Sequence, residues 1–190
     1  MAGWVHVHME YRLEVAGAPE TIPGGTGILL LHPSTADTDR LDTEFLANDT
    51  DHFLVISTRT TADEVDEKLE FYGIEPAAAK IVDAISVERG YSRRESNRVE
   101  YLPGPDDIDG MLHAVERFLT EHQGKRKVSL DSVTELSFYA SESLALEAVE
   151  ALLELLGEYD AVGLFHLAVN VHDSKFVDEV RTHFDVVIEL

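Results

Sequence analysis

The segment HPSTADTD, residues 32–39, follows a short apolar strand and precedes a predicted helix, which is the arrangement that proteins use to bind a nucleotide phosphate. A phosphate-binding loop of this type reads G-x-x-x-x-G-K-[ST]; its glycine N–H groups and lysine contact the phosphates, and its hydroxyl holds Mg²⁺. In that frame His32 and Asp37 stand at the glycines, Thr38 at the lysine and Asp39 at the Ser/Thr. All four defining positions therefore differ.

The two aspartates of this segment oppose phosphate binding. A carboxylate about 4 Å from a phosphate oxygen costs roughly 4 kcal/mol at an effective dielectric constant of 20. Bound Mg²⁺ would offset part of that cost, so nucleotide binding is disfavoured without being excluded. The simplest role for Asp37 and Asp39 is to cap the N-terminus of the following helix. The alternative is that they help to hold a cation or a nucleotide.

Two further strand ends carry polar residues. Asp131 follows the strand 127–130, as does the Walker B aspartate that orients Mg²⁺ in ATPases. Residues 57–60 (STRT) follow another apolar strand and contain no carboxylate. Because the carboxyl ends of parallel strands meet at one edge of a sheet, an enzyme site built from His32, Asp131 and His166 is a further hypothesis.

Short apolar strands alternate with helices along most of the chain, which predicts a mainly parallel sheet covered on both faces, the three-layer α/β/α class. Thr61 and Glu64 form a predicted capping box, and Leu144 is placed on the buried side of its helix. The predicted strands are 27–31, 53–57, 81–85, 99–102, 127–130, 161–169 and 185–189. The predicted helices are 39–47, 61–72, 107–122, 143–156 and 175–183.

Residues 4–15 alternate between apolar and polar side chains, which predicts a half-buried strand before the main domain of residues 19–190. No hairpin partner is obvious, so we expect this strand at an edge of the sheet or added to the sheet of a neighbouring molecule. His6, His8 and Glu10 share its polar side. Solvation is the simplest interpretation of that side, and a metal site is the less favoured alternative.

The chain has 37 acidic and 15 basic residues and a formal net charge of −22. Proteins neutralise nucleic-acid phosphates with Lys and Arg, so we expect no nucleic-acid partner. The sequence has no cysteine, and no apolar run approaches the roughly 18 residues that a membrane span requires. We expect a protein of the high-salt cytoplasm of a halophile, where a carboxylate surface holds water and ions.

The loop of residues 86–98 concentrates positive charge in this acidic chain. One interpretation is a solvated loop whose arginines pair with the nearby Glu88, Glu95 and Glu100. The other is a docking patch for an acidic protein partner, because complementary charge sets orientation and association rate. The arginines are Arg89, Arg93, Arg94 and Arg98.

Over residues 19–190 the order of these segments resembles the RecA-like ATPases of the KaiC type. The similar segments are PETIPGGTGILLLHPS, FLVISTRTTADEVDEKLEFYGI, VEYLPGPDDIDGM, VSLDSVTELSFYASESLALEAVEALLELL and FDVVIEL. The resemblance implies a RecA-like, P-loop NTPase fold. Residue by residue, Asp131 alone keeps the identity of a functional position, because the two catalytic glutamates of the family fall at Thr58 and Arg59.

A fold kept without its chemistry predicts a pseudo-ATPase, which would act as a regulatory or scaffold subunit and need no cofactor. Its expected partner is a protein, either another copy of itself in an oligomer or an active ATPase of the same family. The first alternative is a sensor in which Asp131, with Thr38, Asp37 or Asp39, holds Mg-ATP without cleaving it. The second alternative is the enzyme site at the carboxyl edge of the sheet.

Overall fold

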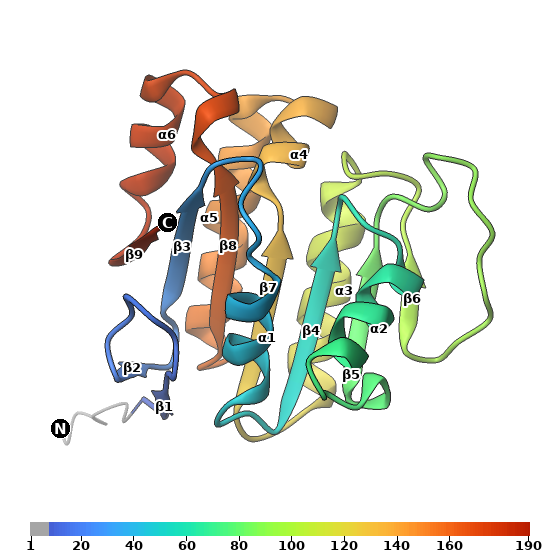
Figure 1. Ribbon diagram of the computed structural model, residues 1–190, viewed down its shortest axis with the longest axis horizontal. Coiled ribbons are helices and arrows are strands. Elements are labelled where there is room, and N and C mark those ends of the chain that lie inside the picture. Colours follow the sequence, from blue (N-terminus) through green and yellow to red (C-terminus); the bar gives the residue numbers. More distant parts are fainter. Residues whose placement is uncertain (1–7) are drawn as a thin grey trace, which may run out of the picture.

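The computed structural model describes residues 8–190, which fold around a seven-stranded sheet (Figure 1). The strands lie in the order β6-β5-β4-β7-β8-β3-β9, and every neighbouring pair is parallel. All their carboxyl ends therefore lie at one edge. The strands are β3 (Gly27–His32), β4 (His52–Ser57), β5 (Ala79–Asp83), β6 (Val99–Tyr101), β7 (Arg126–Asp131), β8 (Val162–Ala168) and β9 (Val186–Glu189).

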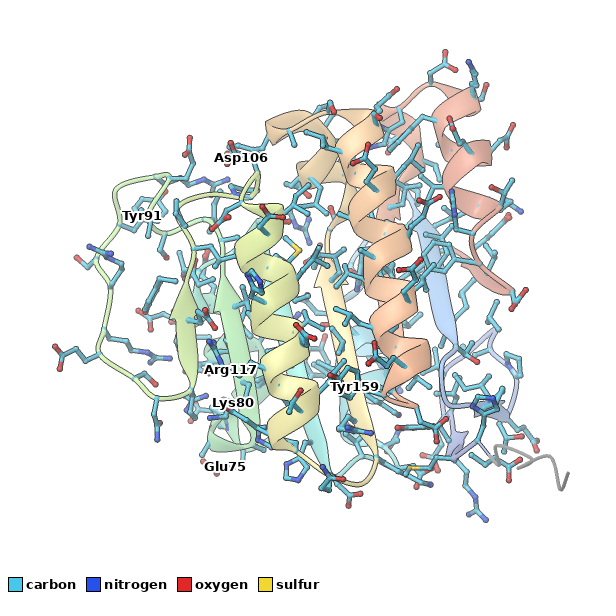
Figure 2. The ribbon with its side chains drawn as sticks, turned by 180° about the vertical axis from the view of Figure 1, so that it is seen from behind. Glu75, Lys80, Tyr91, Asp106, Arg117 and Tyr159 are labelled. Carbon is cyan, nitrogen blue, oxygen red and sulfur yellow. The ribbon has the colours of Figure 1, made fainter. Side chains whose placement is uncertain are left out.

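Helices cover both faces of this sheet, which confirms the predicted three-layer α/β/α class. α1 and α2 lie on the front face in Figure 1, and Figure 2 shows α3 and α5 running side by side across the back. The helices are α1 (Asp39–Ala47), α2 (Ala62–Phe71), α3 (Ile108–Glu121), α4 (Val133–Tyr139), α5 (Glu142–Glu158) and α6 (Ser174–Arg181). Two 3₁₀ turns are η1 (Pro76–Ala78) and η2 (Val169–Val171).

The strands are apolar on both sides because each face of the sheet is covered. All six residues of β3 are buried. On the front face Leu30 and Val55 belong to one core with Phe45 of α1, and on the back Leu54 belongs to a second core with Phe118 of α3. Within residues 8–190, no helix combines the length and the apolar character needed to span a bilayer.

Local sequence signals set several helix starts. α1 begins at Asp39 and ends at Ala47, as predicted. At α2 the Thr61 hydroxyl accepts from the Glu64 N–H, and the Glu64 carboxylate accepts from the Thr61 N–H, which confirms the capping box. β5 begins at Ala79, two residues before the predicted start, because η1 ends at Ala78 and leads straight into the strand.

Two predictions of local structure were wrong, and one helix was not predicted. β1 (Glu10–Arg12) is not at an edge of the main sheet; it pairs antiparallel with β2 (Thr21–Pro23) in a separate two-stranded sheet. α4 was not predicted, since its seven residues are too few for a clear period. Leu144 is 44% exposed, because it lies beside the buried stripe of α5, which runs through Ala145, Val149 and Leu152.

Candidate functional site

The carboxyl ends of β3, β4, β7 and β8 surround a cavity of about 280 Å³ at the upper edge of the sheet in Figure 1. α4 and η2 complete its walls. Parallel α/β proteins bind ligands at this edge, where strand ends from distant parts of the chain meet. The cavity is lined, among others, by His32, Arg59, Asp131, Ser132, Glu135 and Phe138.

Arg59 and Asp131 form an ion pair in this cavity. Arg59 Nη2 donates to Asp131 Oδ2 at 3.0 Å, and the two side chains are 39% and 10% exposed. The negative charge of Asp131 raises the pKa of Arg59 against the opposing effect of burial. Arg59 therefore places a positive charge of the protein itself against Asp131, the Walker B-like aspartate. It stands at one of the two positions where the resemblance to KaiC-type ATPases implies a glutamate.

Thr58, the other such position, holds the turn after β7. Its hydroxyl donates to the Asp131 carbonyl oxygen at 2.9 Å and accepts from the Ser132 N–H at 2.7 Å. Ser132 Oγ in turn donates to Glu135. Burial raises the pKa of Glu135, and the charge of Asp131 adds to that effect, whereas the hydrogen bond from Ser132 opposes it.

The turn of residues 32–39 is tied to the protein itself. Ser34 N–H donates to Asn170 Oδ1 at 2.6 Å, so this backbone donor already has a partner. Asp37 Oδ1 accepts from the Asp39 N–H at 3.1 Å at the start of α1, which agrees with a capping role for Asp37. Asp39 lies 3.8 Å from Lys68. Thr38 is the N-cap residue and makes no side-chain cap bond.

These turn residues and Asp131 have different surroundings. Asp131 and His32 line the cavity, whereas Thr38, Asp37 and Asp39 do not. Two of the three residues of the relocated enzyme site therefore line the cavity, and the turn aspartates do not.

A buried ionic cluster lies between α1 and the sheet, below the cavity. Asp42 accepts from Lys68 Nζ at 2.8 Å and from Ser129 Oγ at 2.5 Å, and its Oδ1 lies 3.2 Å from His166 Nε2. Burial alone would raise the pKa of Asp42, but Lys68 and His166 outweigh it and hold that pKa far below its usual range. The same contacts raise the pKa of Lys68 and of His166 although burial opposes both shifts.

His32 and His166 lie on adjacent strands, with ring centroids 5.7 Å apart and planes at 75°. His166 is 1% exposed and contacts Asp42, so it belongs to the buried cluster and not to the cavity wall. His32 Nδ1 lies 2.9 Å from the Pro33 carbonyl oxygen. Burial lowers the pKa of His32, and the nearby His166 adds to that effect.

This cluster was not predicted from the sequence, although one signal for it was present. Lys127, Ser129 and Asp131 alternate with apolar residues in β7, whereas a strand covered on both faces is usually apolar on both. All three are buried, and Lys127 Nζ donates to the carbonyl oxygens of Phe45 and Asn48 at 2.8 and 2.6 Å. The alternation of polar and apolar residues in β7 thus indicates that one side of the strand contacts polar groups in and next to α1.

The arginine loop is fixed to α2, and its arginines do not pair with the expected glutamates. Arg94 forms an ion pair with Asp63 at 3.0 Å and another with Asp66, and Arg98 contacts Asp66 at 3.1 Å. Glu100, an expected partner, pairs instead with Arg117. Arg89 and Arg93 are exposed and lie outside these ion pairs.

The possible metal site of His6, His8 and Glu10 lies partly outside the described residues. His6 lies outside the described residues, and His8 contacts Asp160 at 2.9 Å. From residue 8 onward, no group of three or more His, Asp or Glu residues is arranged to hold a metal ion.

The strand order, the three layers and the strand-edge site define a RecA-like domain, and solved structures share this fold. A KaiC-like protein from the hyperthermophilic archaeon Pyrococcus horikoshii matches at 12% identity with a TM-score of 0.66, over 96% of this chain and 81% of that one. An ATPase of the type III secretion system of pathogenic bacteria matches at 16% identity with a TM-score of 0.64, over 96% of this chain and 56% of that one. At such identities the likeness shows the fold alone.

The chain belongs to a family of unknown function, DUF7090, whose model matches residues 9–190. A search of curated proteins finds no similar sequence.

Proposed function

We propose that this protein is a RecA-like domain that does not hydrolyse nucleotide and that acts as a regulatory or scaffold subunit through contacts with other proteins. The observation that carries the proposal is the ion pair between Arg59 and Asp131, at 3.0 Å. RecA-like ATPases of the KaiC type need a carboxylate to orient Mg²⁺ and a glutamate to activate water. Here an arginine takes the position of a glutamate, and its charge neutralises the aspartate.

The turn of residues 32–39 supports the same proposal. It has Asp37 at a glycine position, Thr38 at the lysine position and Asp39 at the Ser/Thr position of a phosphate-binding loop. The Ser34 N–H already donates to Asn170. A phosphate brought to this turn would meet negative charge and would have to displace an internal hydrogen bond.

Exposed groups around the site support a role in protein contact. Phe138 is 64% exposed and Val171 41% exposed, both at the mouth of the cavity. Arg89 and Arg93 offer positive charge on a chain of net charge −22. The partner that we propose is another copy of the chain or an active KaiC-type ATPase, in a high-salt cytoplasm that suits so acidic a surface.

The test of inactivity combines an ATPase assay with thermal unfolding in molar KCl, with and without millimolar Mg-ATP or Mg-ADP. A ligand at 100 times its dissociation constant stabilises by about 2.7 kcal/mol, which is several degrees for a domain of this size. We expect neither phosphate release nor a shift. Hydrolysis would overturn the proposal, and a shift that Asp131→Ala abolishes would favour the nucleotide sensor.

The test of the scaffold role measures association directly. Light scattering after gel filtration gives the oligomeric state, and surface plasmon resonance gives binding to a KaiC-type ATPase from the same cells. We expect Arg93→Glu to lower the association rate several-fold, because an exposed charge acts mainly on encounter. A monomer that binds no such ATPase would contradict the role.

A second candidate is an enzyme with its site in the cavity, favoured because His32 and Asp131 both line it. The contact of His166 with Asp42 removes that histidine from the candidate catalytic groups. A turnover found in a substrate screen and lost in His32→Gln, with folding unchanged, would support this candidate.

A further inference from the structure

The cavity contains a buried acceptor that no group of residues 8–190 uses. His32 is 4% exposed, and its Nε2 has no hydrogen-bond partner there. Its other nitrogen, Nδ1, faces the Pro33 carbonyl oxygen, which can only accept, so Nδ1 carries the proton. Burial also keeps the ring neutral by lowering the pKa of His32. Nε2 is therefore unprotonated, and its lone pair is free to accept a hydrogen bond from a ligand.

The hydroxyl groups around the cavity are engaged within the protein. Ser132 Oγ donates to Glu135, and Thr134 Oγ1 accepts from the N–H of the last residue of β8. Ser34 Oγ accepts from Asn170 Nδ2 at 3.0 Å. Among the buried side-chain polar atoms of residues 8–190 that line the cavity, His32 Nε2 and Arg59 Nε are left without a hydrogen-bond partner.

The charges of the cavity do not balance. Asp131 and Glu135 contribute two carboxyl groups, and Arg59 contributes one guanidinium, which contacts Asp131. Glu135 has a hydrogen bond from Ser132 but no ion pair among the described residues. Burial raises the pKa of Glu135 and the charge of Asp131 adds to that effect, which is a shift that a bound cation would oppose.

An aromatic surface borders this excess negative charge. Phe138 lines the cavity and is 64% exposed. One side of its ring lies on His172, with centroids 5.3 Å apart and planes at 19°, which leaves the opposite side for a ligand. Cations bind over aromatic faces, and a planar guanidinium does so while its N–H groups donate to carboxylates.

We propose that this cavity binds a small organic cation, with a guanidinium group as the best fit. Its N–H groups donate to Glu135 and His32 Nε2, its plane lies on Phe138, and a neighbouring carbonyl or hydroxyl oxygen of the ligand accepts from Arg59 Nε. An anionic ligand would add to the excess negative charge. The inference goes beyond the regulatory role and does not depend on it, because it concerns a ligand and not a partner subunit.

The test compares two ligands that differ in one group. Nα-acetyl-L-argininamide carries a guanidinium, and Nα-acetyl-L-citrullinamide replaces it with an uncharged urea of the same shape. Isothermal titration calorimetry should show saturable binding of the first, at least tenfold tighter than of the second, and weaker binding as KCl rises. Equal affinities, or no saturation by either ligand, would overturn the proposal.

Matched variants locate the binding. Glu135→Gln keeps the shape of the side chain and removes its charge, so it should weaken binding at least tenfold. Glu142→Gln changes the net charge of the protein equally at an exposed position outside the cavity, and should alter affinity less than twofold. Phe138→Ala should weaken binding several-fold, whereas Phe71→Ala, on the exposed side of α2, should not. If both variants of a pair lose the same affinity, the ligand is attracted to the acidic surface in general, and binding in the cavity is contradicted.

Two more measurements complete the test. The ¹⁵N resonance of His32 Nε2 should move on saturation with argininamide, because a lone pair becomes a hydrogen-bond acceptor; an unmoved resonance counts against the proposed pose. Agmatine and an arginine-containing peptide then distinguish two sources of the same chemistry. Tighter binding of agmatine indicates a free metabolite, and tighter binding of the peptide indicates the side chain of a protein.

Discussion

Asp42 brings three side chains together in the interior: Lys68, Ser129 and His166. Removing one member of a buried ion pair leaves the other charge uncompensated, which costs about 3–5 kcal/mol. We therefore expect Asp42→Asn to lower the free energy of unfolding by about that amount. Urea denaturation in molar KCl, followed by circular dichroism, measures the change.

Asp39 provides the control for that variant, because it approaches the same lysine from the surface. It lies 3.8 Å from Lys68 Nζ, and its side chain is 49% exposed. Exposed pairs contribute about 0–1 kcal/mol. Asp39→Asn should therefore change the stability by less than about 1 kcal/mol, and an effect equal to that of Asp42→Asn would refute the burial argument.

Arg59 contributes the positive charge that contacts Asp131 in the cavity. Replacing it with glutamate should gather three carboxylates, from positions 59, 131 and 135, around the cavity. Carboxylate oxygens are the preferred ligands of hard divalent cations. We expect Arg59→Glu to bind Mn²⁺ at least tenfold more tightly than the parent protein, as read by electron paramagnetic resonance. Adding Asp131→Asn should reverse the gain, and binding that survives it would place the ion elsewhere.

At the scale of elements, the end of α1 is joined to β7 by Lys127, which is fully buried beneath it. Burial lowers the pKa of Lys127 to about 8, whereas the unfolded value is 10.5. Between these values the unfolded chain binds the proton and the folded chain has lost it, so stability should rise with pH. The contribution reaches at most about 1.4 kcal/mol per pH unit and stops near the unfolded pKa.

The measurement is the difference in unfolding free energy between the parent and Lys127→Met from pH 7 to pH 10. The neutral amine still donates to both carbonyl groups, so the difference should grow in favour of the parent across this interval. Lys175→Met removes an exposed ammonium from α6 and serves as the control. For the control, the difference in unfolding free energy between parent and variant should not change with pH. If the difference for Lys127→Met does not change either, the lowered pKa of Lys127 is contradicted.

Elements with local signals could be predicted, and contacts between distant elements could not. The Thr61–Glu64 capping box and the apolar run of β3 are encoded within a few residues. The partner of β1 is not, because pairing with β2 depends on the loop between them. Asp42 and Lys68 read as ordinary polar helix residues, and their burial becomes visible once α1 and α2 lie against β7.

At the candidate site the same limit applies. Asp131 and the substitution of Arg59 could be found by resemblance, since both follow strands in a known order. Their direct contact depends on β4 and β7 being neighbours, which is a property of the sheet order. One interpretation of the arginine loop, pairing with the nearby glutamates, was wrong for the same reason: Asp66, which pairs with Arg94 and Arg98, lies far back in the sequence on α2.

For the whole molecule, a net charge of −22 on 190 residues makes self-repulsion a main term in stability. The Debye length falls from about 8 Å at 0.15 M salt to about 3 Å at 1 M, so salt should remove much of that repulsion. We expect the thermal midpoint to rise on the order of 10 °C between 0.2 and 3 M KCl. Scanning calorimetry at several KCl concentrations measures this shift, and an unchanged or lower midpoint would contradict it.

Surface and interior should respond differently to the same salt. Screening acts on exposed charges and barely reaches a buried pair, because no ions enter the space between its members. The loss of stability in Asp42→Asn should therefore stay the same, within about 0.5 kcal/mol, at 0.2 and 3 M KCl, while the midpoints of both proteins rise together. If the loss of unfolding free energy in Asp42→Asn becomes smaller as the KCl concentration rises, the Asp42–Lys68 pair is accessible to solvent. In that case α1 and α2 pack less tightly on β7 than in the structure described above.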